Sequence, residues 1–154
     1  MEMKETFSQI DQVGIIVRDM EKTIEYYSSF GVGPFKPLNV TAVQRMLYGK
    51  PVSDVKNIVR FAQMGRVQIE LIQPVGKGTA NQEFLDRRGE GINHLGSFVV
   101  DLDKEVAKLT AKGFKVIQSG KFLGGGGFAY FDTDKVGGVL FELIQWPVGI
   151  GLEA

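Results

Sequence analysis

The chain has 154 residues, the size of one ordinary domain, and its 18 basic residues balance its 18 acidic residues, so charge gives no argument for binding nucleic acid. It contains no cysteine, which excludes disulfides and thiolate metal sites. No apolar run reaches the roughly 18–20 residues of a membrane helix, and the polar start MEMKETFSQID shows no secretory signal, so we expect a cytoplasmic protein without a membrane partner.

The first half of the chain predicts one strand, one helix and three further strands. Gln12–Val17 is an apolar run rich in β-branched residues, which is typical of a strand. Asp19 stands where a helix N-cap is expected, and apolar residues at helical spacing follow it until Gly31. The later strand-like runs are residues 34–40, 55–63 and 66–73. Residues 41–53 are the least regular and are predicted as a loop or lid.

The second half repeats this order after a linker. Ala80–Arg88 predicts a short helix that ends at Gly89. A strand starts near Ile92, Asp101 is the next N-cap, and the helix that follows ends near Gly113. The remaining strand-like runs are residues 114–118, 127–132 and 138–145.

Two ungapped alignments within the chain indicate an internal duplication. Residues 10–31 match residues 92–113 at an offset of 82, and this alignment pairs Gly14 with Gly96. The tetrapeptide ELIQ at 70–73 recurs at an offset of 72. The two halves therefore share their first strands and their last strands.

The duplication predicts a single α+β domain over residues 1–154. Two tandem βαβββ modules are expected to form a curved mixed sheet around a metal-containing cleft. Module one spans about 9–74, the linker helix about 80–88 and module two about 91–147. The first and last strand of each module are expected to lie at the centre of this sheet.

Four polar side chains occupy matched positions of the two halves. Gln12 and His94 lie on the first strands, and Glu70 and Glu142 lie on the last strands. Any one of them alone is more often a solvated or structural residue, but their matched positions favour a common site. A carboxylate among apolar neighbours is costly when it is buried unpaired, and a cation offsets that cost. Three oxygen donors and one imidazole suit a divalent Co, Mn, Ni, Fe or Zn ion with two open positions.

The two modules and this four-residue pattern resemble the vicinal oxygen chelate superfamily, which includes glyoxalase, bleomycin resistance and dioxygenase proteins. The resemblance runs from about Ile10 to Trp146. Within the superfamily, the chain is most similar to methylmalonyl-CoA epimerase. The stretches that carry this similarity are residues 69–74, 84–94 and 137–143.

This resemblance implies an isomerase that takes a small-molecule substrate, with an acyl-CoA among the candidates, and that forms a homodimer. In such epimerases a divalent metal holds the thioester carbonyl and the carboxylate of the substrate, and carboxylates move the α-proton. Glu142 is expected to be the base, and Glu70 is expected to be its partner on the opposite side.

Two positions depart from the epimerase pattern. Gln12 stands where those epimerases usually have histidine, although glyoxalase I can carry glutamine there. Some of these epimerases have a catalytic glutamate on the strand before Glu70, where the nearest match here is Arg60. An arginine could bind an anionic substrate group but could not act as a base. Lys121, near a run of glycines, is a second candidate for binding substrate, at a phosphate of a CoA tail.

Three functions remain open from the sequence. The first is the epimerase or isomerase. The second is a glyoxalase I-like lyase that acts on a thiol adduct, which residues 84–94 argue against. The third is a non-catalytic small-molecule-binding module of the same fold, although such modules usually lose the metal ligands. A ring-cleaving dioxygenase fits less well, because its metal prefers two histidines and one carboxylate, and the chain has a single histidine.

Overall fold

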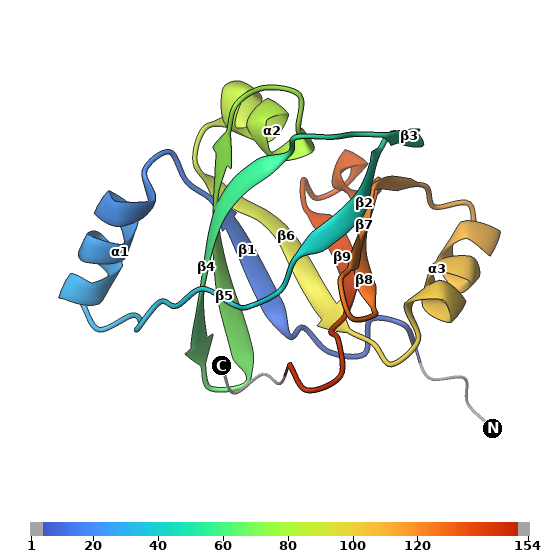
Figure 1. Cartoon of the computed structure of the whole chain (residues 1–154), viewed down its shortest axis with the longest axis horizontal. Coiled ribbons are helices and arrows are strands. Elements are labelled where there is room, and N and C mark those ends of the chain that lie inside the picture. The colour runs from blue at the N-terminus through green and yellow to red at the C-terminus, as the bar shows by residue number, and fades with distance from the viewer. Residues whose placement is uncertain (1–4, 151–154) are drawn as a thin grey trace.

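Nine strands form one mixed sheet in the computed structural model, which describes residues 5–150. The strands are β1 (Gln12–Ile16), β2 (Ala42–Leu47), β3 (Lys50–Pro51), β4 (Lys56–Met64), β5 (Val67–Val75), β6 (Gly91–Phe98), β7 (Val116–Phe122), β8 (Gly127–Phe131) and β9 (Leu140–Gln145). Their order across the sheet is β3-β2-β7-β8-β9-β6-β1-β5-β4. The sheet curls into a half-barrel (Figure 1). The α+β class and the curved mixed sheet are therefore confirmed, whereas residues 1–4 and 151–154 of the predicted domain lie outside the described residues.

The two central strands bring the halves of the chain together. β1 pairs with β6 in antiparallel fashion, and each is flanked by the last strand of its own half. β5 runs parallel to β1, and β9 runs parallel to β6. The strands that carry the four predicted ligands are therefore neighbours at the centre of the sheet.

Three helices pack around the sheet. They are α1 (Met20–Ser29), α2 (Ala80–Arg88) and α3 (Leu102–Ala111), with a 3-10 turn η1 at Thr133–Lys135. In Figure 1, α1 and α3 lie on opposite flanks and α2 lies at one end of the sheet. Within residues 5–150, every helix is too short or too polar to cross a membrane.

Repeated polar contacts fix where α1 and α3 begin. The side chains of Asp19 and Asp101 are the N-caps and accept hydrogen bonds from backbone N–H groups in the first turns, as predicted. The side-chain oxygens of Gln73 and Gln145 accept hydrogen bonds from the first N–H of α1 and α3, at 2.7 and 2.9 Å. The ELIQ repeat thus ends in a glutamine that ties each helix to the last strand of its own half.

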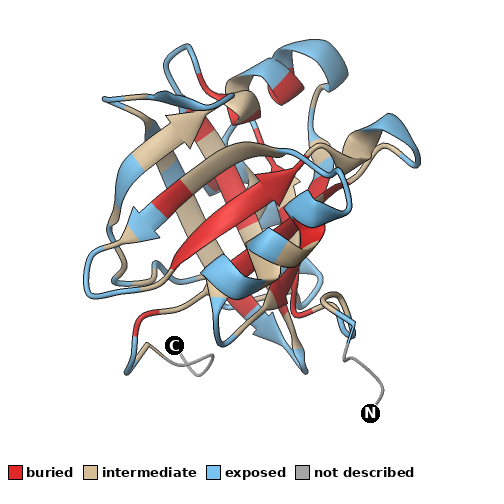
Figure 2. Cartoon of the chain, turned by 90° about the vertical axis from the view of Figure 1, so that its right-hand side faces the viewer, coloured by how far each residue is buried: buried red, intermediate tan, exposed pale blue. Residues whose placement is uncertain are grey.

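Part of the apolar core lies on the outer face of the sheet, under α1 and α3. α1 covers a cluster that includes Met20 and Leu71, and α3 covers a cluster that includes Leu109, Phe131 and Leu143. Figure 2 looks onto α3 and shows buried strands behind the exposed outer side of the helix. The inner face of the sheet is left free of these two helices and lines a cavity.

The segment after α1 departs from the predicted elements. The strand predicted at 34–40 is reduced to one bridge between Lys36 and Phe61, because Pro34 and Pro37 have no N–H to donate to a ladder. The prediction of a loop or lid at residues 41–53 is wrong, because this segment contains β2 and β3. β2 pairs with β7 of the other half, so the chain crosses in front of the inner face (Figure 1).

Candidate metal centre

The strand register places the four predicted ligands on the inner face. Gly14 on β1 is opposite Glu70 on β5 and His94 on β6. Two residues earlier on β1, Gln12 is opposite Gly96 on β6, and Gly96 is in turn opposite Glu142 on β9. Residues directly opposite or two apart on neighbouring strands point to the same side of a sheet. The duplication therefore brings one donor from each of four neighbouring strands to one point.

The four donor atoms converge at the spacing that a metal ion needs. His94 Nε2 lies 3.0 Å from Glu70 Oε2, 3.0 Å from Glu142 Oε2 and 3.0 Å from Gln12 Oε1. Ligands about 2.1 Å from a cation and at right angles to each other lie about 3.0 Å apart. Glu70, His94 and Glu142 form a buried group that could hold a metal ion. The two carboxylates match the charge of a divalent ion.

Neighbouring side chains orient two of the donors. His94 Nδ1 lies 3.1 Å from Asn93 Oδ1, so that an Nδ1–H donor leaves the Nε2 lone pair facing the centre. Gln12 Nε2 donates to Gln68 Oε1 at 2.7 Å, which directs the Gln12 amide oxygen to the centre. Without a cation, the Gln12 side chain forms better hydrogen bonds when its amide oxygen and nitrogen exchange places. Its nitrogen then lies 3.1 Å from Glu70 Oε2 and 3.3 Å from Glu142 Oε2 and can donate to both. The inward oxygen is therefore the orientation that suits a bound cation.

Two glycines make room for these side chains. A Cβ atom at Gly14 would overlap the imidazole ring of His94. A Cβ atom at Gly96 would lie 3.2 Å from Cβ and 3.3 Å from Oε1 of Gln12. Gly14 and Gly96, which the internal alignment pairs, thus have one role in both halves: each lets the side chain of a predicted ligand lie flat across the neighbouring strand.

The electrostatics of the group favour positive charge at its centre. Burial disfavours the charged imidazolium of His94, but the nearby Glu142 and Glu70 carboxylates outweigh this effect and raise the pKa of His94 to about 10. Burial also raises the pKa of Glu142, against the opposing pull of His94. A cation at this point would take over the charge compensation that the His94 proton provides in its absence.

The centre opens into a cavity of about 730 Å³ with an aromatic wall. Tyr130 is directly opposite Glu142 on β8, and its ring meets the His94 ring edge-on at 5.0 Å. The wall continues through the rings of Phe128, Phe122 and Trp146, with Phe122 and Trp146 stacked at 5.4 Å. The sequence pattern alone does not single out these residues. Alternation along GFAYF at 127–131 groups Phe128 with Tyr130, but all five residues are buried, so the pattern does not reveal which face lines a cavity.

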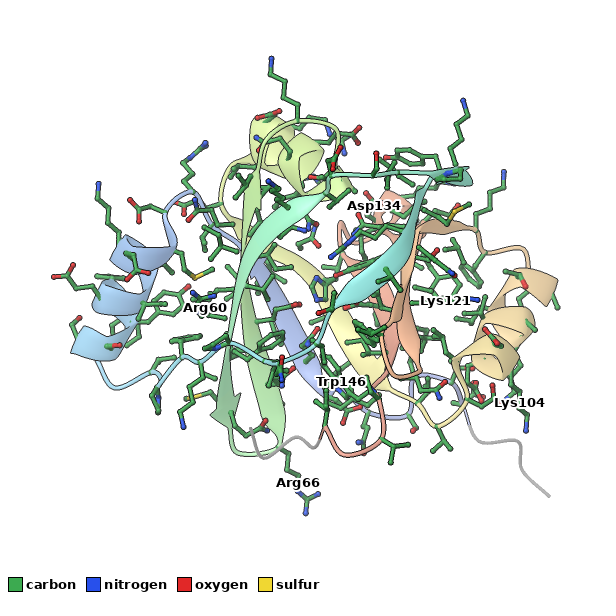
Figure 3. The ribbon with its side chains drawn as sticks, in the orientation of Figure 1. Arg60, Arg66, Lys104, Lys121, Asp134 and Trp146 are labelled. Carbon is green, nitrogen blue, oxygen red and sulfur yellow. The ribbon has the colours of Figure 1, made fainter. Side chains whose placement is uncertain are left out.

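The two predicted substrate-binding residues lie away from the metal centre. The residue opposite Glu70 on β4 is Phe61, whereas Arg60 is opposite Leu71, on the face that α1 covers. Arg60 still contributes to the cavity rim, and its Nη1 donates to a backbone oxygen at 2.8 Å. Lys121 is exposed and lies on the α3 side of the sheet (Figure 3). Substrate binding by either residue stays a prediction.

The chain is similar to known proteins in sequence and in fold. The chain is similar to the uncharacterized protein YqjC of Bacillus subtilis (strain 168), with 25% identity over 90% of this chain and 92% of that protein. Methylmalonyl-CoA epimerase from Mycobacterium tuberculosis superposes with a TM-score of 0.64 and 25% identity, covering 96% of this chain and 93% of that chain.

A variant of Streptomyces coelicolor methylmalonyl-CoA epimerase in complex with 2-nitronate-propionyl-CoA superposes with a TM-score of 0.65 and 21% identity, covering 92% of this chain and 96% of that chain. At this identity the likeness concerns the fold alone. Residues 11–131 match the model of one family. The chain therefore belongs to the glyoxalase/bleomycin resistance protein/dioxygenase superfamily.

Proposed function

We propose that this protein is a divalent-metal-dependent epimerase or isomerase, similar to methylmalonyl-CoA epimerase, that removes and returns a proton next to a substrate carbonyl. The observation that carries the proposal is the pair of carboxylates, Glu70 and Glu142, each 3.0 Å from His94 Nε2 at the floor of one cavity. The match to the Mycobacterium tuberculosis epimerase over nearly the whole chain supports the same class of reaction.

The four converging side chains have the chemistry to hold the cation. Gln12, Glu70, His94 and Glu142 are the proposed ligands, with three oxygens and one nitrogen. A divalent ion bound there supplies Lewis-acid polarisation of the substrate carbonyl.

The protein's own groups then move the proton. Glu70 and Glu142 come from equivalent strands of the two halves, so they approach the centre from opposite sides of the pseudo-twofold axis. We assign Glu142 as the base that takes the proton from the substrate carbon. Glu70 takes up a proton from solvent and donates it to the opposite face of the same carbon, Glu142 releases its proton to solvent, and the stereocentre is inverted. The aromatic wall beside Glu142 gives this side of the cavity an apolar surface.

A glyoxalase I-like lyase is a second candidate, and two residues favour it. Gln12 supplies an amide oxygen where epimerases usually have histidine. Phe61, opposite Glu70, provides no acid on the strand where some epimerases carry a catalytic glutamate. Both reactions move a proton next to a carbonyl, so they share the roles of Glu70 and Glu142.

Deuterium exchange separates these functions. Metal-loaded protein is incubated in heavy water with methylmalonyl-CoA, or with the hemithioacetal of methylglyoxal and glutathione, and each reaction is repeated after chelation. Metal-dependent exchange into methylmalonyl-CoA supports the epimerase. Conversion of the hemithioacetal alone supports the lyase. Bound metal without either reaction rejects both substrates.

Glu142→Gln should reduce turnover of the active substrate by about 100-fold or more, because an amide cannot accept the proton. Glu25→Gln, an exposed change on α1, is the control and should leave turnover unchanged. Metal content is measured on the same samples, which separates loss of the base from loss of the cation. Turnover near the wild-type rate in Glu142→Gln would reject its assignment as the base.

A further inference from the structure

We propose that Arg45 binds an anionic group of the substrate, so that the cavity selects a small organic acid, or a thioester that keeps a free carboxylate, with an apolar body. This inference rests on the proposed function for the position of the reacting carbon. It rests on the geometry of β2 for the position of the anion.

A bulge in β2 turns Arg45 towards the cavity. The register of β2 against β7 shifts between Val43 and Met46, so that Gln44 and Arg45 together oppose Gly120. Gln44 has a φ of 47°, in the left-handed region that residues other than glycine seldom adopt. A bulge of two residues against one redirects side chains, and bulges are common beside active sites. Arg45 accordingly lines the cavity, although its strand is near the edge of the sheet.

The guanidinium group lies over an aromatic ring of the cavity wall. Arg45 Cζ is 5.7 Å from the centre of the Phe128 ring. Phe128 occupies the space that a side chain at Gly120 would take, because a Cβ atom there would come within 2.6 Å of the ring. The bulge, the glycine and the ring together hold the cationic group above the aromatic wall.

Within residues 5–150, no ion pair or hydrogen bond compensates the charge of Arg45. Arg60 and Arg88, in contrast, each donate a hydrogen bond to a backbone oxygen. Burial lowers the pKa of Arg45, because a charged guanidinium loses solvation there, and the nearby Tyr130 only partly opposes this effect. An anionic group of a ligand would offset this cost, and a planar guanidinium matches the two oxygens of a carboxylate.

The cavity also offers an apolar surface. The rings of Phe122, Phe128 and Trp146 provide the apolar wall. The side chains therefore match a ligand with an acidic end and an apolar body.

Isothermal titration calorimetry with two probes of similar shape tests this inference. Phenylmalonate carries carboxylates beside an acidic carbon and an apolar ring, and phenylmalonamide is its neutral counterpart. Wild type, Arg45→Gln, Arg45→Lys and Arg66→Gln are titrated both Zn²⁺-loaded and metal-free. Arg66 lies at the β4–β5 turn and points away from the cavity, so its variant controls for the loss of one positive charge (Figure 3).

We expect Arg45→Gln to weaken phenylmalonate binding about tenfold or more, with phenylmalonamide affinity unchanged. Arg45→Lys should lose less affinity for phenylmalonate than Arg45→Gln does, and Arg66→Gln should bind both probes with the affinity of the wild type. An equal loss for both probes, no loss, or wild-type protein that binds neither probe would overturn the inference. Thermal unfolding of each variant identifies misfolded samples. If Arg45→Gln is misfolded, the phenylmalonate affinity of Arg45→Lys decides the test. Arg45-dependent binding without deuterium exchange would reject the proposed function alone.

Discussion

Positions 14 and 96 carry no side chain where the inner face of the sheet would otherwise have one. At Gly14 the free space is filled by the His94 ring, and at Gly96 it is filled by the side chain of Gln12. The side chains of His94 and Gln12 can therefore lie across the sheet towards the carboxylates of the last strands. The shape of the candidate metal centre depends on these missing Cβ atoms as much as on the donor groups.

Gly14→Ala should remove metal binding and lower the free energy of unfolding by about 1–3 kcal/mol, because the new Cβ displaces His94. Gly96→Ala is the matched control, since its Cβ would meet Gln12 at 3.2 Å and needs only a small shift. Urea unfolding and metal analysis measure both effects. Equal behaviour of the two variants would show that the His94 position does not depend on Gly14.

The four proposed ligands could be predicted from the sequence, because Gln12 and His94, like the two glutamates, occupy matched positions of a duplication. Tyr130 and Arg45 could not be predicted in the same way. Tyr130 belongs to a strand that is buried on both faces, and Arg45 owes its direction to a bulge that depends on pairing with a distant strand. Such residues are placed by tertiary contacts rather than by local pattern.

At the scale of elements, the two ELIQ tetrapeptides combine a site residue with a structural residue. Alternation along the strand sends the glutamate to the inner face and the glutamine, three residues later, to the outer face. Gln73 and Gln145 then accept the first N–H of α1 and α3. Each helix start is thereby tied to the strand that carries a carboxylate of the metal centre.

Gln73→Ala and Gln145→Ala should each lower the free energy of unfolding by about 0.5–2 kcal/mol, because a partly buried helix N–H loses its acceptor. Metal content should not change, since both side chains lie on the face away from the centre. Gln63→Ala, at an exposed position near the end of β4, should cost less than about 0.5 kcal/mol. Urea denaturation gives these differences, and values for Gln73 and Gln145 no larger than the control would contradict the anchoring role.

The elements that matched prediction are those with strong local signals. The helix at Ala80–Arg88 agrees because Thr79 caps its start and Gly89, with a φ of 78°, ends it. The segment after α1 failed for opposite reasons in its two parts. Two prolines break the pattern at 34–40, and a bulge conceals the strand Ala42–Leu47. Its partner β7 lies about 75 residues away in the sequence, beyond the reach of any local window.

At the scale of the whole molecule, the site exists only where the two halves meet. β1 and β5 supply Gln12 and Glu70 from one half, and β6 and β9 supply His94 and Glu142 from the other. Neither half contains more than two of the proposed ligands. The crossing of β2 to β7 adds a further link between the halves and carries Arg45 to the cavity. The predicted homodimer stays a prediction.

The convergence of four donors at one point predicts one metal ion per chain, and metal stoichiometry tests this most directly. Purified protein is reconstituted with Mn²⁺, Co²⁺, Ni²⁺, Fe²⁺ or Zn²⁺, freed of excess metal by gel filtration, and analysed by mass spectrometry together with His94→Ala and Glu70→Ala. We expect one ion per wild-type chain, with little or none in either variant, and a higher thermal midpoint for the loaded wild type. Wild-type protein without stoichiometric metal, or variants that retain it equally, would contradict the four-ligand centre.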